Sequence, residues 1–236
     1  MKTVQELVCD LSYSDPGTHI FGECRRIKRA YEPKILGIYG QRLDACNVKI
    51  RFAAKSYLEV QDIVGELEHG EFIYFDDASR LNMTFYVESF LIYSRAALDL
   101  AVSAYHTYFT GDTNLDSFHG FVKKIPGEVD WLPGNSKRLW SAVHKDYNSE
   151  DCYTWIHALV GTEKGLSLRD LVVHKSNVVI DTYIGENDKG RFYIGLTRDS
   201  MGHIVPWLDH IFNWTWKILL TIKRDIVNAE KALGKQ

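Results

Sequence analysis

The stretch PKILGIYGQRLDACNVKIRFAAKSYLEVQDIVGELE, Pro33 to Glu68, decides the fold of this chain. Its apolar residues recur at alternating steps of three and four, which places about one apolar side chain per turn on one side of a helix. These residues are Leu36, Tyr39, Leu43, Cys46, Ile50, Ala53, Tyr57, Val60, Val64 and Leu67. We therefore predict a long amphipathic helix from about Pro33 to Glu68, with Gly70 supplying the stop.

Two further long helices are predicted. The segment from about Asp77 to Phe109 is apolar nearly all round, which is typical of a central, buried helix, and Gly111 ends it. The segment from Ile204 to Leu233 closes the chain as a third. We expect its inward face to carry Leu208, Ile211, Trp214 or Thr215, Ile218, Ile222 and Ile226.

The remaining segments are shorter. We expect a short helix or bent extension over Phe21 to Tyr31, a loop-rich connection with one or two short helices over residues 111 to 150, and a short helix over Asp151 to Leu159. Two runs rich in Val, Ile, Tyr and Phe flank GENDKG, which predicts a β-hairpin from about Val178 to Thr197. The expected fold is mainly α: one up-and-down helical bundle over residues 1–236, with 1–32 as an N-terminal extension and the β-hairpin near 178–197.

Composition narrows the classes of function. The chain of 236 residues has a formal net charge of −3, which argues against a protein that coats nucleic acid electrostatically but leaves room for a small basic site. No apolar run is long enough to span a membrane and the N-terminus is too polar for a secretory signal, so we expect a cytoplasmic protein with no membrane partner. The four cysteines are widely separated, which favours free thiols over a metal site, and no phosphate-cradling glycine motif occurs, so we expect no cofactor.

A polar seam crosses the second long helix. Glu88, Arg95, Asp99 and His106 are separated by seven, four and seven residues, so all four fall on one narrow stripe. Arg95 and Asp99 stand at the spacing that favours an ion pair. Paired structural charges and a supporting part in a site are both open interpretations, because buried charges are normally paired in either case.

The stretch LSLRDLVVHKSN, Leu166 to Asn177, carries the strongest candidate site. Ser167 and Asp170 form a Ser-x-x-Asp pattern, which predicts a helix that begins at Leu168. Arg169 then lies in the first turn, where the helix dipole opposes a cation, and a bound anion would favour it there. His174 lies four residues after Asp170 on the same face, so the carboxylate can fix the tautomer of the imidazole.

RDLVVH resembles the Arg-x4-to-x6-His signature of HEPN domains, the higher eukaryotes and prokaryotes nucleotide-binding family. Members are helical bundles with this motif on a late helix, and many are metal-independent ribonucleases that dimerise so that two motifs face one cleft. The helix that carries Glu88, Arg95 and Asp99 looks like an early HEPN helix packing near the motif. The resemblance covers the chain in outline from about Leu36 to Leu233, and only the six-residue motif is specific.

The resemblance implies a catalytic set of Arg169, His174 and Asp170. His174 would help to deprotonate a ribose 2′-hydroxyl, Arg169 would stabilise charge on phosphorus, and Asp170 would orient His174. Two other segments match the spacing, Arg138 to His144 and Arg198 to His203, and only the middle match has an N-cap, an apolar filling and a late-helix position.

Two functions from different classes follow. The first is a homodimeric RNA endonuclease, a defence or toxin effector with an RNA substrate and an antitoxin or other assembly partner. The second is a non-catalytic HEPN-like scaffold or nucleotide-binding module, in which Arg169 and Asp170 serve only as a salt bridge and a cap. The acidic composition favours the second function slightly, and the presence of both Arg169 and His174 favours the first.

Overall fold

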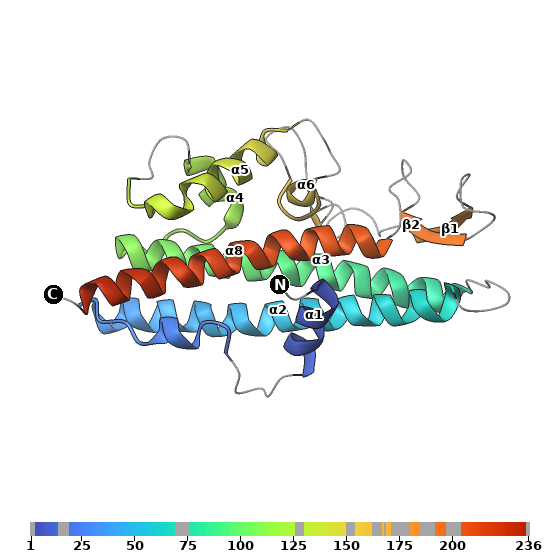
Figure 1. The fold of residues 1–236 in the computed structure, drawn as a ribbon, viewed down its shortest axis with the longest axis horizontal. Helices are drawn as coiled ribbons and strands as arrows, with labels where there is room; N and C mark the ends of the chain where they lie inside the picture. The colour runs from blue at the N-terminus through green and yellow to red at the C-terminus, as the bar shows by residue number, and fades with distance from the viewer. Residues whose placement is uncertain are drawn as a thin grey trace.

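The chain is mainly helical in a computed structural model (Figure 1). The structure describes residues 3–13, 19–68, 76–125, 130–149, 154–161, 167, 169–170, 180–184, 192–196 and 204–234. Three long helices run side by side along the longest axis: α2 (Pro33–Glu68), α3 (Asp77–Thr110) and α8 (Ile204–Leu233). Their bounds confirm the three long helices predicted from the sequence, and the apolar stripe of α2 is buried from Tyr39 to Val64.

Both ends of α3 are fixed by local chemistry. The Asp76 carboxylate accepts a hydrogen bond from the Ser79 amide at 2.6 Å, which satisfies a donor of the first turn. At the other end, Gly111 adopts φ 75° and its amide donates to the Thr107 carbonyl at 2.9 Å. A Cβ at Gly111 would lie 3.2 Å from the Tyr31 ring, so both the backbone conformation and the close approach require glycine.

Helices α2 and α3 are antiparallel. The Arg42 guanidinium donates to the Ser103 carbonyl at 3.3 Å, and one turn later along α2 the Cys46 thiol donates to the Ala97 carbonyl at 3.3 Å. As residue numbers rise along one helix they therefore fall along the other. The predicted up-and-down order describes this pair.

Helix α8 runs in the same direction as α3, so the order of the three long helices differs from a strict up-and-down bundle (Figure 1). The Phe90 and Phe212 rings lie 6.4 Å apart, and further along both helices the Tyr105 hydroxyl donates to the Asp225 carboxylate at 2.8 Å. The physical reason is the long excursion between the two helices, because it returns the chain to the end of the bundle at which α3 begins.

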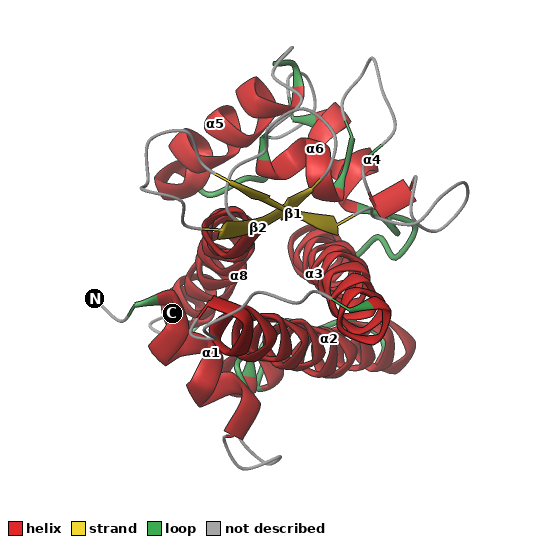
Figure 2. Cartoon of the chain, turned by 90° about the vertical axis from the view of Figure 1, so that its right-hand side faces the viewer, coloured by secondary structure: helices red, strands yellow, loops and turns green. Residues whose placement is uncertain are grey.

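A layer of short helices covers one side of the bundle: α4 (Phe118–Lys124), α5 (Lys137–Tyr147) and α6 (Trp155–Leu159). It follows α3 in the chain and packs on α3 and α8 (Figures 1 and 2). Aromatic rings join it to α3, because the Tyr105 ring lies 6.4 Å from Phe121 and 6.0 Å from Trp140. The expectation of one or two short helices between residues 111 and 150 is thus confirmed by α4 and α5, and a 3₁₀ turn (Gly134–Ser136) precedes α5.

The N-terminal region differs from our expectation. Residues 1–32 were expected to be an extension, with a short helix or bent extension over Phe21 to Tyr31. The structure instead has helix α1 (Val4–Tyr13), which packs on α2 and α8, and a 3₁₀ turn (Gly22–Arg25). Val8 is fully buried in this contact. Packing on α2 and α8 stabilises α1, because a ten-residue helix is only marginally stable by itself in water.

Two short strands, β1 (Ile180–Ile184) and β2 (Phe192–Leu196), pair antiparallel, with Ile180 opposite Leu196 and Ile184 opposite Phe192. The strands lie within the segment for which we predicted a hairpin, and the connection between them lies outside the described residues. Helix α6 begins at Trp155 after the N-cap Thr154, later than the predicted Asp151, which also lies outside the described residues. Gly161, at φ 78°, ends this turn.

None of the helices in the described part of the chain is long and apolar enough to cross a bilayer.

Replacing Tyr105 by phenylalanine is expected to lower the free energy of unfolding by about 2 kcal/mol. The change keeps the ring in its aromatic cluster and removes the donor to the Asp225 carboxylate, whose side chain is only 2% exposed. Urea denaturation followed by circular dichroism measures the loss. The control is Tyr93→Phe on the same helix, because the Tyr93 ring is only half-buried. Equal midpoints for wild type and Tyr105→Phe would contradict the expectation.

Candidate functional site

The predicted cap at Ser167 is confirmed, and the predicted first helical residue, Leu168, lies outside the described residues. The Asp170 amide donates to the Ser167 hydroxyl at 2.9 Å, and Ser167 is fully buried. Residues 169 and 170 are helical. Arg169 therefore lies in the first turn of a capped helix, where free backbone N–H groups and the helix dipole favour negative charge.

Arg169 and Asp170 form an ion pair. Arg169 Nη1 donates to Asp170 Oδ1 at 2.8 Å, and each side chain is 29% exposed. Arg169 Nε is buried and has no hydrogen-bond partner within the described part of the chain. Burial by itself would raise the pKa of Asp170. Hydrogen bonds from the Ser167 hydroxyl and the Arg169 guanidinium, together with the positive charge of Arg95, outweigh this effect, so the pKa of Asp170 is lowered. Asp170 is therefore a carboxylate at neutral pH.

A second ion pair lies within α3, and both of its residues also hydrogen-bond to the layer of short helices. Arg95 Nε donates to Asp99 Oδ1 at 2.8 Å, and Arg95 Nη1 donates to the Leu159 carbonyl at the end of α6 at 3.0 Å. Asp99 Oδ1 also accepts from the Phe118 amide at 2.7 Å, so it satisfies a donor at the start of α4. The predicted pairing of Arg95 with Asp99 is confirmed.

The two ion pairs belong to one site, which we call the charge cluster and define as Arg95, Asp99, Arg169 and Asp170. Burial raises the pKa of Asp99, and the positive charges of Arg95 and Arg169 oppose that rise. The charge of Arg95 in turn contributes to the lowered pKa of Asp170. The positive charge of each arginine thus lowers the pKa of the carboxylate in the other pair. The fold brings Arg95 and Asp99 of α3 near Arg169 and Asp170, although the two pairs are about seventy residues apart in the sequence.

His119 is a neighbour of the charge cluster that sequence reasoning missed. It follows Phe118 at the start of α4, and its half-buried ring meets the Tyr147 ring edge to face at 5.5 Å. Burial lowers the pKa of His119, as do Lys123 and Arg95, whereas Asp170 and the backbone of Val160 raise it. The sequence feature that could have indicated the helix carrying His119 is its N-cap Ser117. The Ser117 hydroxyl accepts a hydrogen bond from the Gly120 amide at 3.1 Å and so fixes the start of α4.

The other members of the predicted site are placed differently. His106 lies away from the charge cluster, with Nδ1 3.3 Å from the Asp112 carbonyl oxygen and its ring 5.6 Å from Trp131. Glu88 is half-buried on α3, two turns before Arg95. His174 lies outside the described residues.

The two alternative motif matches also have defined outcomes. Arg138 and His144 stand on α5, where Arg138 is exposed and His144 Nε2 lies 2.9 Å from the Asn148 side-chain nitrogen. Arg198 and His203 lie outside the described residues. Arg169 has two features that Arg138 lacks: its helix has an N-cap side chain that accepts a hydrogen bond, and a second arginine lowers the pKa of its carboxylate partner.

Comparison with known proteins gives no relative: no family model, curated protein or solved structure matches the chain. Within the described residues, no group of three or more His, Cys, Asp or Glu side chains is arranged to hold a metal ion. The chemistry of the site therefore rests on its geometry. Within the charge cluster the two carboxylates balance the two guanidinium charges. Arg169 Nε has no partner among the described residues, so it is available to donate to a phosphate oxygen or another oxyanion.

The protein is expected to lose stability as the pH falls below about 6.5, the ordinary pKa of histidine. Burial lowers the pKa of His19, His106 and His119, so the folded state binds protons at these sites less readily than the unfolded state. Their contribution is complete above pH 6.5 and decreases as the pH falls towards the lowered values. His119→Gln should reduce the slope of unfolding free energy against pH over this range. An unchanged slope in urea titrations of the variant would contradict the expectation.

Proposed function

We propose that this chain is a HEPN-like, metal-independent RNA endonuclease that acts as a homodimer, in the manner of a defence or toxin effector. The observation that carries the proposal is Arg169, which stands in the first turn of a capped helix with a guanidinium N–H that has no partner among the described residues. An anionic phosphate oxygen would satisfy both the guanidinium and the helix start.

The proposed reaction is an internal phosphoryl transfer. The ribose 2′-oxygen attacks the adjacent phosphorus, the bond from phosphorus to the 5′-oxygen breaks, and the products are a 2′,3′-cyclic phosphate and a 5′-hydroxyl. His174 takes the proton of the 2′-hydroxyl, water protonates the departing 5′-oxygen, and Arg169 stabilises the negative charge on the phosphoryl oxygens. No metal takes part in this scheme.

The geometry refines the part assigned to Asp170. Its carboxylate accepts from Arg169 Nη1, and its lowered pKa keeps it charged at neutral pH. We therefore assign to Asp170 the positioning of the guanidinium, in addition to the orientation of His174 suggested by the sequence spacing. Arg95 and Asp99 support the site from α3, because they hold the start of α4 and the end of α6.

The test is RNA cleavage in EDTA by the purified full-length chain. Structured RNA should yield fragments with cyclic phosphate ends, and Arg169→Ala and His174→Ala should each lower the rate by about 100-fold or more. Arg138→Ala is the matched control, because it removes an exposed arginine at similar spacing from a histidine. The proposal fails if wild type does not cleave, or if all three variants cleave equally.

A second candidate is a non-catalytic scaffold, which the ion pairs favour. Arg169 and Arg95 each have a carboxylate partner within the chain, as structural charges normally do. In that case Arg169→Ala lowers the stability of the chain while RNA remains intact with every variant. Thermal unfolding measured beside the cleavage assay separates the two candidates, because a nuclease variant loses its rate at a temperature at which it is still folded.

A further inference from the structure

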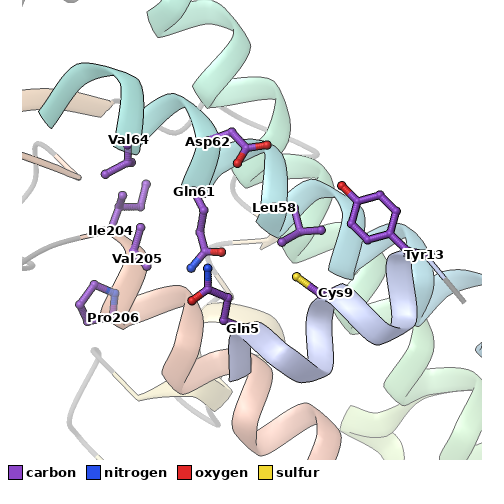
Figure 3. Close-up of a pocket in the computed structure, with 11 residues that line it drawn as sticks. Gln5, Cys9, Tyr13, Leu58, Gln61, Asp62, Val64, Ile204, Val205 and Pro206 are labelled. Carbon is purple, nitrogen blue, oxygen red and sulfur yellow. The ribbon is translucent and has the colours of Figure 1, made fainter. Parts of the chain in front are cut away.

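A cavity of about 470 Å³ lies between α1, α2 and α8 (Figure 3). It is on the side of the bundle away from α4 and α6, and so away from the charge cluster (Figure 2). Eleven residues line it, namely Gln5, Cys9, Tyr13, Leu58, Gln61, Asp62, Val64, Gly65, Ile204, Val205 and Pro206. Its size is within the range of small-molecule sites, which are commonly a few hundred Å³.

The orientation of the Gln61 amide is fixed by a hydrogen-bond chain behind the cavity. The Tyr57 hydroxyl has one proton, and it donates that proton to the Asp209 carboxylate. Burial raises the pKa of Tyr57, so the hydroxyl stays protonated. Tyr57 therefore has only an acceptor left for Gln61, and Gln61 must present Nε2, which donates at 2.8 Å. Gln61 Oε1 consequently points away from Tyr57.

Gln61 Oε1 is a buried acceptor without a hydrogen-bond partner in the described structure. Because Gln61 also lines the cavity, this fixed acceptor is placed to take a hydrogen bond from a donor on a bound molecule. The exposed side chain of Gln5 lies towards Gln61 from α1 (Figure 3). A ligand that displaces Gln5 would bring its donor to Gln61 Oε1.

The charge and shape of the lining indicate the class of ligand. Asp62 is the one formally charged residue among the eleven that line the cavity, so the wall carries a negative charge. Tyr13 adds an aromatic ring, which attracts cations, and the segment Ile204 to Pro206 adds an apolar wall. Negative charge, a free amide acceptor, an aromatic ring and an apolar wall together suit a cation with N–H donors on a hydrophobic body.

We propose that the cavity between α1, α2 and α8 is a binding site for a small organic cation with an amine or amidinium group on an apolar body. Gln61 Oε1 accepts from the cationic group, Asp62 provides the opposite charge, and Leu58, Val64 and Ile204 contact the apolar body. This site is independent of the proposed nuclease function, because it shares no residue with the charge cluster.

Gly65 allows the cavity to be closed without strain. A Cβ built at Gly65 meets no atom within 4 Å, so Gly65→Leu places its side chain in the open space of the cavity. Gly40 provides the matched control, because it is also a half-buried glycine of α2 with nothing within 4 Å of an added Cβ. It lies about 37 Å from Gly65 along the helix axis. Both variants should raise Tm by about 2–4 °C through better helix propensity.

The test uses benzamidine as the probe, with benzamide and benzoate as neutral and anionic analogues of the same shape. Ligand-observed NMR should show that benzamidine binds wild type and Gly40→Leu alike, and that benzamide and benzoate bind much more weakly. Gly65→Leu should weaken benzamidine binding by about tenfold or more. Asp62→Asn, which removes an exposed charge, should weaken benzamidine binding by no more than about fivefold and leave benzamide binding unchanged.

Three results would overturn the proposal. They are no binding of benzamidine to wild type, equal binding of the three analogues, and binding to Gly65→Leu as strong as to Gly40→Leu. Each of these binding results can be interpreted independently of the RNA cleavage assay.

Discussion

Replacing Phe121 by alanine is expected to lower the free energy of unfolding by about 3–5 kcal/mol. Phe121 is 1% exposed and lies where α4 meets α3, with its ring 4.8 Å from Trp140 and 6.0 Å from Trp131. Truncation removes the transfer free energy of the ring and leaves a cavity that large aromatic neighbours fill poorly.

The measurement is equilibrium denaturation in guanidinium chloride, with far-UV and near-UV circular dichroism recorded together. Phe85→Ala is the matched control, because Phe85 is 62% exposed on the same bundle and its loss should cost at most about 0.5 kcal/mol. The near-UV signal, which reports the tryptophans of this aromatic cluster, should be lost at lower denaturant in Phe121→Ala. Equal effects of the two substitutions would show that α4 is not anchored through Phe121.

Replacing Arg95 by methionine is expected to lower the free energy of unfolding by about 3 kcal/mol. The Arg95 side chain is 11% exposed, and its removal leaves the Asp99 carboxylate without its ion-pair partner and the Leu159 carbonyl without its donor. Adding Asp99→Leu should recover part of the loss, because it removes the uncompensated charge. The recovery is incomplete because the Phe118 amide then loses its acceptor, at a cost of about 1 kcal/mol.

The double-mutant cycle is best measured at neutral and at acidic pH. Burial raises the pKa of Asp99, so the folded state binds this proton more tightly than the unfolded state and stability falls as the pH rises above about 3.8, the ordinary value. Without Arg95 the rise in pKa is larger, so the gap between wild type and Arg95→Met should narrow in acid. The exposed Arg25–Asp44 pair is the control, and Arg25→Met should cost no more than about 1 kcal/mol at either pH.

The long helices were predictable because each carries a periodic signal over many turns. In α2 the apolar residues keep one helical face from Leu36 onwards, and in α3 the stop at Gly111 is readable from the residue type alone. In α8 the spacing allows either Trp214 or Thr215 on the inward face. Thr215 is fully buried, whereas Trp214 is half-buried and stacks on Trp155 at 5.3 Å.

Helix α1 was missed, although its signal is present. Val4, Leu7, Val8 and Leu11 follow the helical spacing, but the helix has only ten residues and derives its stability from packing on α2. The direction of α8 was missed for a different reason. Periodicity gives the buried face of a helix and contains no information on which way the helix runs.

The candidate site was predictable in part. The cap at Ser167 and the Arg95–Asp99 pair follow from spacings of three and four residues within single helices. The electrostatic link between the two arginine pairs depends on tertiary packing, and His119 enters through α4, which has no periodic relation to either helix. The cavity beside Gln61 was not predictable, because three helices line it and one of them, α1, was not expected.

The parallel course of α3 and α8 has a consequence for the order of folding. The α2–α3 pair is joined by a short connection and can form early, whereas the contact between Tyr105 and Asp225 spans 120 residues. At translation rates of about 5–20 residues per second, synthesis of the chain between α3 and α8 takes roughly 5–20 s after α2 and α3 are complete. During that interval the apolar surface that receives α8 is open to solvent. Nascent chains that stop before Ile204 should therefore be the species most prone to aggregation and most in need of chaperones.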